Sequence, residues 1–76
     1  MHYFDVKMAY KVEGLLVPKE QVHYTDIVWA GCALRAKIRA KQSIRILCAT
    51  QQLSVTDMEV RDVSQVPDDL INWIST

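Results

Sequence analysis

Two histidines and two cysteines are the side chains of this sequence that could bind a transition metal. They are His2, His23, Cys32 and Cys48. A structural zinc site is built from close ligand pairs, such as C-x-x-C or H-x-x-x-H, because one local element then fixes two ligands. The sequence contains no such pair, so we expect no metal site and no cofactor.

A catalytic thiolate or a pair of catalytic carboxylates finds equally little support. A reactive cysteine needs a thiolate that is stabilised in an electropositive pocket. Cys32 has basic neighbours at Arg35 and Arg39, but its segment is rich in alanine and carries a tryptophan, which favours a packing role. The adjacent acids Asp68 and Asp69 follow a proline and suit the first turn of a helix. We therefore expect that the protein is not an enzyme and has no small-molecule substrate.

Charge is the strongest chemical signal that remains. The chain has nine basic and nine acidic residues, so its formal net charge is zero. Residues 35–45 nevertheless contain five cations and no acid, whereas residues 57–69 contain five acids and one arginine. The cations are Arg35, Lys37, Arg39, Lys41 and Arg45. Such a segment could contact several phosphates, so accessory nucleic-acid binding is the alternative function. The competing interpretation is a solvated helix flank.

Size and composition predict one small domain over residues 1–76. An apolar fraction of 50% with 24% charged residues is typical of a folded protein. No apolar stretch approaches the roughly 20 residues of a membrane span, and the start of the chain does not resemble a secretory signal. Two isolated cysteines do not form a secreted disulfide framework. We expect a cytoplasmic protein with reduced, buried thiols and no membrane contact.

The clearest structural pattern lies at the start of the chain. Apolar residues at even positions from Phe4 to Val12 alternate with mostly polar ones, which predicts a strand with one buried face. Glu13 and Gly14 supply a turn. A second strand is expected within residues 15–23, and it is expected to be an edge strand or to contain a bulge, because Pro18 cannot donate a hydrogen bond to a ladder.

A helix is predicted over residues 26–41. Thr25 can cap its start, Asp26 suits its first turn, and the basic residues of its last turns suit the dipole. At about 100° per residue, one apolar stripe faces the sheet. It comprises Ile27, Ala30, Gly31, Leu34 and Ile38. A second apolar stripe lies on the opposite side of the helix. It comprises Trp29, Ala33, Ala36 and Ala40, with Cys32 beside it.

The second half of the chain predicts two more strands and a terminal turn. Residues 43–50 are expected to form a third strand and residues 58–63 a fourth, with a helix over residues 54–64 as the competing assignment. Pro67 and the acids after it open a short helix. The predicted fold class is therefore α+β: an antiparallel sheet of three to four strands with one central helix on one face (ββαββ) and a short C-terminal helical turn.

The second apolar stripe carries the functional prediction. An apolar patch on the solvent side of a helix indicates an interface, and an exposed tryptophan is a typical anchor. We predict a non-enzymatic protein-binding module whose partner is another protein or a second copy of the chain, as a homodimer. The predicted partner-binding residues are Trp29, Cys32, Ala33, Ala36 and Ala40, with Arg35 and Arg39 at the rim. Alternatively, the terminal segment with Leu70, Trp73 and Ile74 folds back over this stripe.

The order of the predicted elements is similar to that of many small phage-encoded proteins. Those that inhibit host polymerase, nucleases or CRISPR complexes often have this build, which in this sequence is a strand from residue 4, a glycine turn, a second strand, one alanine-rich helix and one or two closing strands. The resemblance covers most of the chain as a pattern and transfers no site residue. It implies a stoichiometric inhibitor that acts by steric occlusion of a host protein.

Overall fold

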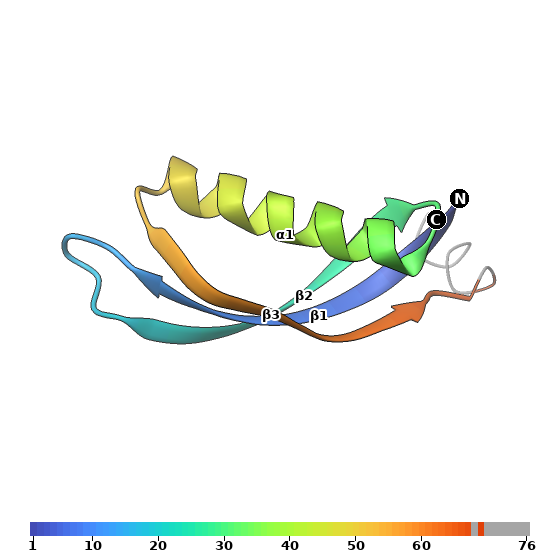
Figure 1. The fold of residues 1–76 in the computed structure, drawn as a ribbon, viewed down its shortest axis with the longest axis horizontal. Helices are drawn as coiled ribbons and strands as arrows, with labels where there is room; N and C mark the ends of the chain where they lie inside the picture. The colour runs from blue at the N-terminus through green and yellow to red at the C-terminus, as the bar shows by residue number, and fades with distance from the viewer. Residues whose placement is uncertain (68, 70–76) are drawn as a thin grey trace.

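A computed structural model describes residues 1–67 and residue 69 of the chain. The described residues form three strands and one helix, in the order β1 (His2–Glu13), β2 (Glu20–Ala30), α1 (Ala33–Thr50) and β3 (Ser54–Gln65). The strands make one antiparallel sheet with the order β2-β1-β3, and α1 lies along one face of it (Figure 1). The α+β class, the antiparallel sheet and the helix on one face are therefore confirmed.

The alternation in β1 is confirmed as the origin of the core. Its apolar residues at even positions, from Phe4 to Val12, are all buried beneath α1. The largest fully buried side chains are Met8, Ile44 and Val6, and burying a side chain of this kind contributes roughly 1.5–3 kcal/mol. The first strand is thus both the central strand of the sheet and the main apolar surface of the domain.

The second strand lies at the sheet edge, as predicted, but further along the chain. The loop after Gly14 is closed by mutual main-chain hydrogen bonds between Gly14 and Val17, of 3.0 and 3.3 Å. Pro18 lies in this loop, and β2 begins only at Glu20. The range of 15–23 was wrong because the turn takes up the proline, while the β-branched and aromatic residues after it favour a strand.

The predicted helix over residues 26–41 is wrong at both ends. Residues 26–30 belong to β2 and pair with β1, from Asp26 opposite Val6 to Ala30 opposite His2. The capping signal at the start of that range is therefore overridden by strand pairing. The helix begins after Cys32, whose backbone is extended and whose side chain makes no cap hydrogen bond.

The predicted strand over residues 43–50 is also wrong, because this segment is the second half of α1. Residues at a spacing of four form the buried stripe of the helix, and the row continues from the alanines into the supposed strand. It comprises Ala36, Ala40, Ile44 and Cys48. The parallel row through Leu34 and Ile38 is interrupted by Gln42, so it faces solvent, with Leu34 66% and Ile38 46% exposed. The predicted orientation of the helix is therefore inverted.

The predicted strand at residues 58–63 is confirmed, as part of the longer β3, and the competing helix over residues 54–64 is wrong. It is the third strand of the sheet and not a fourth, since residues 43–50 are helical. Its register with β1 shifts twice, between Lys7 and Met8 and between Ala9 and Lys11. The predicted C-terminal helical turn after Pro67 lies essentially outside the described residues.

Candidate functional site

The residues predicted to bind a partner do not form one stripe. Ala36 and Ala40 are completely buried between α1 and the sheet, because their small side chains let the helix approach closely. Trp29 lies near the end of β2, and Cys32 and Ala33 are exposed at the start of α1. The two alanines are core residues and are unavailable to a partner. The segment with Leu70, Trp73 and Ile74 lies outside the described residues.

Trp29 lies in an exposed aromatic corner that also contains Tyr3 and Ile27. Tyr3 and Trp29 are directly opposite each other in the β1–β2 ladder, with ring centroids 4.6 Å apart and planes tilted by 57°. Ile27 is two residues from Trp29 and therefore points to the same face of the sheet, away from α1. Trp29 is 46% and Ile27 49% exposed. This corner is the apolar surface that remains open on the far face of the sheet.

The main-chain N–H and C=O groups of Trp29 point away from β1, outward from the edge of the sheet. The Tyr3 carbonyl accepts a hydrogen bond of 2.9 Å from the Val66 N–H, so the polar groups of Tyr3 are directed toward β3. Tyr3 and Trp29 therefore form a non-hydrogen-bonded pair of the antiparallel ladder. In agreement, the Trp29 carbonyl accepts a hydrogen bond from Nη1 of Arg39 on α1.

The same alternation extends along β2. Register with β1 is unbroken from Ala30 opposite His2 to Glu20 opposite Val12. Outward-pointing main-chain groups therefore recur at every second residue before Trp29, namely at Ile27, Thr25 and His23. We call residues 23–29 the β2 edge. No strand covers this edge in the part of the chain that the structure describes.

The opposite edge of the sheet, along β3, is irregular and charged. Two register shifts interrupt its pairing with β1, and Asp57 has a positive φ of 53°. Exposed ion pairs join Lys11 to Asp57 at 3.4 Å and Arg61 to Glu59 at 3.0 Å. Bulges and charges of this kind keep edge strands from pairing with other chains.

The outer surface of α1 carries the basic segment of the sequence. All five of its cations lie on this helix, with Lys41 partly buried and the other four exposed. Arg39 reaches β2, as its hydrogen bond to the Trp29 carbonyl shows. Lys37 lies toward β3, where it lines a shallow hollow together with Val60 and Asp62. The structure thus keeps the five residues of the predicted nucleic-acid surface on one element and divides four of them between its two flanks, with Arg45 between the flanks.

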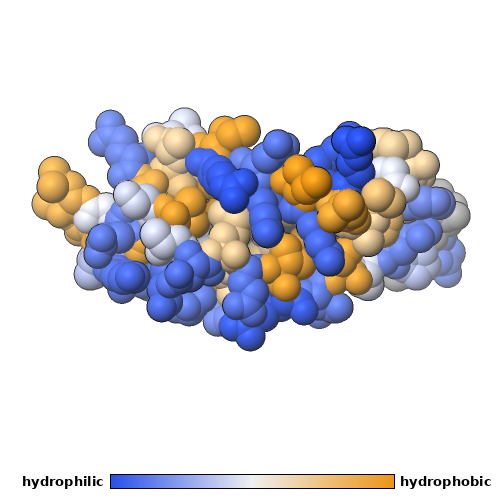
Figure 2. Space-filling view, in the orientation of Figure 1, coloured by the Kyte–Doolittle hydropathy of each residue, from blue (hydrophilic) through white to orange (hydrophobic). Residues whose placement is uncertain are grey.

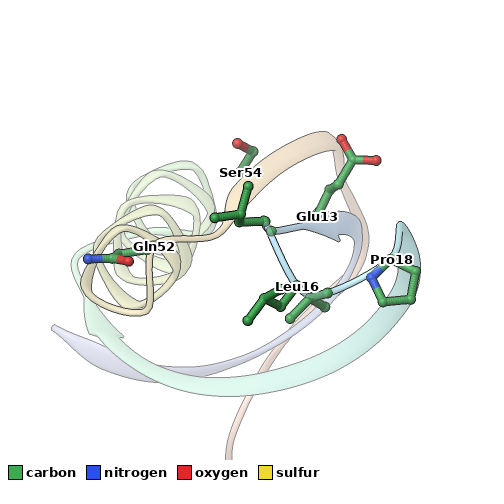
Figure 3. A pocket seen from close by; sticks show the side chains of 8 residues that line it. Glu13, Leu16, Pro18, Gln52 and Ser54 are labelled. Carbon is green, nitrogen blue, oxygen red and sulfur yellow. The ribbon is translucent and has the colours of Figure 1, made fainter.

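A larger hollow, of about 620 Å³, lies between the β1–β2 loop and the turn that joins α1 to β3. Figure 3 shows that the side chains of Glu13 and Ser54 point away from Leu16 at this site. Leu15 and Leu16 are fully exposed at the tip of the loop. Since the only ionisable group in its lining is Glu13, the hollow offers no acid–base pair.

The candidate metal ligands are not brought together. The described residues contain no cluster of three or more histidine, cysteine or acidic side chains that could hold a metal ion. Both cysteines are free; Cys48 is buried, as predicted, whereas Cys32 is exposed and that part of the prediction is wrong. Burial raises the pKa of Tyr10, with smaller contributions from Cys48 and Tyr24, so this phenol stays neutral.

Comparison with models of known protein families, with curated proteins and with solved structures finds no match to this chain. Over the described residues, α1 is the longest helix and it is too polar to span a bilayer.

Proposed function

We propose that the chain is a non-enzymatic protein-binding module that accepts an extended strand of a partner protein along its β2 edge. The observation that carries the proposal is the unbroken row of outward main-chain groups ending at the half-exposed Trp29. In strand addition, main-chain hydrogen bonds supply affinity and alternate side chains supply specificity. Trp29 keeps the anchoring role that its residue type predicts.

Apart from one charged side chain, Asp26, the β2 edge lacks the features that protect natural edge strands. Its sequence contains no proline or glycine between Glu20 and Ala30, and its pairing with β1 contains no bulge. Three of its large apolar side chains are 40–49% exposed, and they are Tyr24, Ile27 and Trp29. A fourth strand would cover Ile27 and Trp29 on the far face and Tyr24 on the helix face. An exposed apolar edge of this kind is a template for strand pairing.

Charge favours a different protein over a second copy as the occupant. Antiparallel pairing of two β2 edges would place both α1 helices on the same face of a continuous sheet. The Arg39 flank of each helix, with Arg35 one turn before it, would then face the same flank of the other copy. Like charges across an interface are unfavourable. We therefore propose a partner strand with acidic side chains on the helix side, and self-association is one of the outcomes of the test.

The proposed mode of action is steric occlusion. A partner strand held on the β2 edge cannot pair with its own sheet or bind its own ligand, so a stoichiometric complex blocks the partner. This agrees with the phage-type inhibitor that the order of elements implies. We propose a cytoplasmic location, because an exposed free thiol such as that of Cys32 is compatible with a reducing compartment.

The test removes one outward N–H from each edge of the sheet. Thr25→Pro deletes an outward donor of the β2 edge without touching the β1–β2 ladder, and Gln65→Pro is the matched change on β3. Gln65 is exposed and, one residue before the hydrogen-bonded Val66, its N–H points away from β1. The probe is a displayed library of random extended peptides, selected on the wild-type protein.

We expect the selected peptides to carry acids at alternate positions and to bind the wild type and Gln65→Pro equally. Thr25→Pro should lose binding by about tenfold, since proline removes one outward donor and its ring obstructs the approach of the partner strand. Hydrogen exchange should show bound-state protection confined to residues 23–29. Equal binding by Thr25→Pro, or protection elsewhere, would contradict the proposal. If sedimentation shows a stable dimer that forms through this edge, the occupant of the edge is a second copy of the chain and not a strand of another protein.

A further inference from the structure

The charges of this molecule are divided between its two layers. Helix α1 carries five cations and no acid, while the acids of the described chain lie in the strands, loops and tail. The ion pairs among the described residues, Lys11–Asp57 and Arg61–Glu59, use no residue of α1. No carboxylate of the described residues therefore neutralises a cation of the helix by direct contact.

Helix stability does not explain where these cations are placed. The dipole of a helix favours acids in the first turn and bases in the last. In α1 the first turn has no acid and contains Arg35, and the last turn has no base. The start of the helix also lacks a side-chain cap. The cations thus lie toward the end where the dipole opposes them, which points to a ligand outside the chain.

The cations form two rows on opposite flanks of α1. Arg35 and Arg39, one turn apart, face β2, where Arg39 contacts the Trp29 carbonyl and keeps its remaining donors. Lys37 and Lys41 face β3; Lys37 shares a hollow with Asp62 but forms no ion pair with it. At 3.6 residues per turn the two rows are about 160° apart around the helix.

Between the two rows, the ridge of the helix is an exposed and uncharged strip apart from Arg45. It carries Leu34, Ile38 and Gln42. Figure 1 shows α1 forming one long side of the molecule with no described element above it, and Figure 2 shows hydrophobic and hydrophilic side chains interspersed along that side. The molecule as a whole is narrow, with Cα extents of 43 × 25 × 17 Å. Nothing described therefore obstructs the approach of a large ligand to the ridge.

We infer that the outer face of α1 binds double-stranded DNA, with the ridge in the major groove and one basic row on each phosphate backbone. A helix with its side chains is about 10–12 Å across, close to the roughly 12 Å width of that groove. The two opposed rows then meet the two strands, while Leu34 and Ile38 can contact thymine methyl groups. A-form RNA has a major groove too narrow for a helix, so duplex RNA does not fit. An acidic protein surface would engage one flank and leave the other in solvent.

The DNA surface shares the Arg35–Arg39 flank with the proposed partner strand but uses no main-chain group of the β2 edge, so each proposal can fail alone. The experiment uses fluorescence anisotropy with a labelled DNA duplex of about two helical turns, titrated at several salt concentrations. Four to five phosphate contacts predict a slope of log K against log salt of about −4, with micromolar to submillimolar affinity at physiological salt. Thr25→Pro should bind the duplex like the wild type.

Paired variants test the two-row geometry. The double variant Lys37→Gln/Lys41→Gln removes one row and should flatten the slope by about 2. Lys7→Gln/Lys19→Gln removes the same charge outside α1 and should leave the slope unchanged. Ile38→Glu places a negative charge on the ridge and should weaken binding by tenfold or more. Together these results would support insertion of the helix into the groove.

Three outcomes would overturn the inference. The first is no binding to the duplex at about 50 mM salt, where backbone contacts are strongest. The second is a flattening of the salt slope in the Lys7/Lys19 control equal to that in the Lys37/Lys41 variant, since net charge alone would then explain the effect. The third is equal affinity for single-stranded DNA, duplex RNA or poly-glutamate, because none of these presents a groove that matches the two rows.

Discussion

The two edges of the sheet have opposite character, although both strands pair with the same central strand. The β2 edge pairs with β1 in an unbroken register and carries exposed apolar side chains. The main-chain groups of every second residue, from His23 to Trp29, point outward from the sheet. The β3 edge has two register shifts, a residue with positive φ and two exposed ion pairs. The difference teaches that this domain protects itself from edge pairing on one side only. An unprotected edge beside a protected one is expected of a binding surface.

The largest expected effect comes from Trp29→Ala. Loss of a tryptophan anchor typically weakens binding by about 2 kcal/mol or more, which is roughly 30-fold in Kd. The unfolding free energy should fall by only about 1 kcal/mol, the usual contribution of an aromatic pair such as Tyr3–Trp29. Calorimetric titration with a selected peptide and urea unfolding measure the two quantities. Gln65→Ala on β3 is the control, and an equal loss of binding there would remove the distinction between the edges.

A second test uses glycine and valine at matched positions of the two edges. Asp57 has a positive φ, so Asp57→Gly should be more stable than Asp57→Val by about 1–2 kcal/mol. Thr25 lies in the regular part of β2, where valine is favoured over glycine. The unfolding free energy of Thr25→Val should therefore exceed that of Thr25→Gly by about 1 kcal/mol. Urea unfolding of the four variants measures both differences. Differences of the same sign would show that the edges do not differ in backbone geometry.

The smallest effect is expected for the exposed ion pair on β3. Glu59→Gln removes the partner of Arg61, both side chains being more than half exposed, and should change the unfolding free energy by less than about 0.5 kcal/mol. The change should vanish at about 1 M salt. A larger loss of unfolding free energy that does not depend on salt would indicate that this ion pair determines the backbone structure of the β3 edge.

The local patterns of the sequence predict the strands better than the helix. The alternation from Phe4 to Val12 needs no other part of the chain, because one buried face already determines it. The helix prediction failed because Thr25 and Asp26 resemble a helix start but lie in a strand that pairs with β1. The apolar residues of 43–50 fit a strand or a helix equally well. The signal that could have decided between the two is the row of small and apolar residues at a spacing of four from Ala36 to Cys48, which is typical of a helix.

The candidate sites depend on which face of each element is buried. Residue type alone indicated Trp29 as an anchor, and it is exposed, but its place on a sheet edge follows from pairing with a distant segment. The alanines were assigned to the surface because the helix was placed seven residues too early along the chain. The division of the basic segment between two flanks follows from helical periodicity, whereas which flank faces β2 and which faces β3 required the true orientation of α1.

The position of β1 in the sheet has a consequence for synthesis on the ribosome. This central strand leaves the exit tunnel before the other two strands, yet one of its two neighbours, β3, is almost the last part of the described chain to be made. The hairpin with β2 can form early, but the other side of β1 stays unpaired until β3 has emerged. Chains that stop short of β3 therefore expose their most hydrophobic strand, and we expect them to be removed by chaperones and proteases.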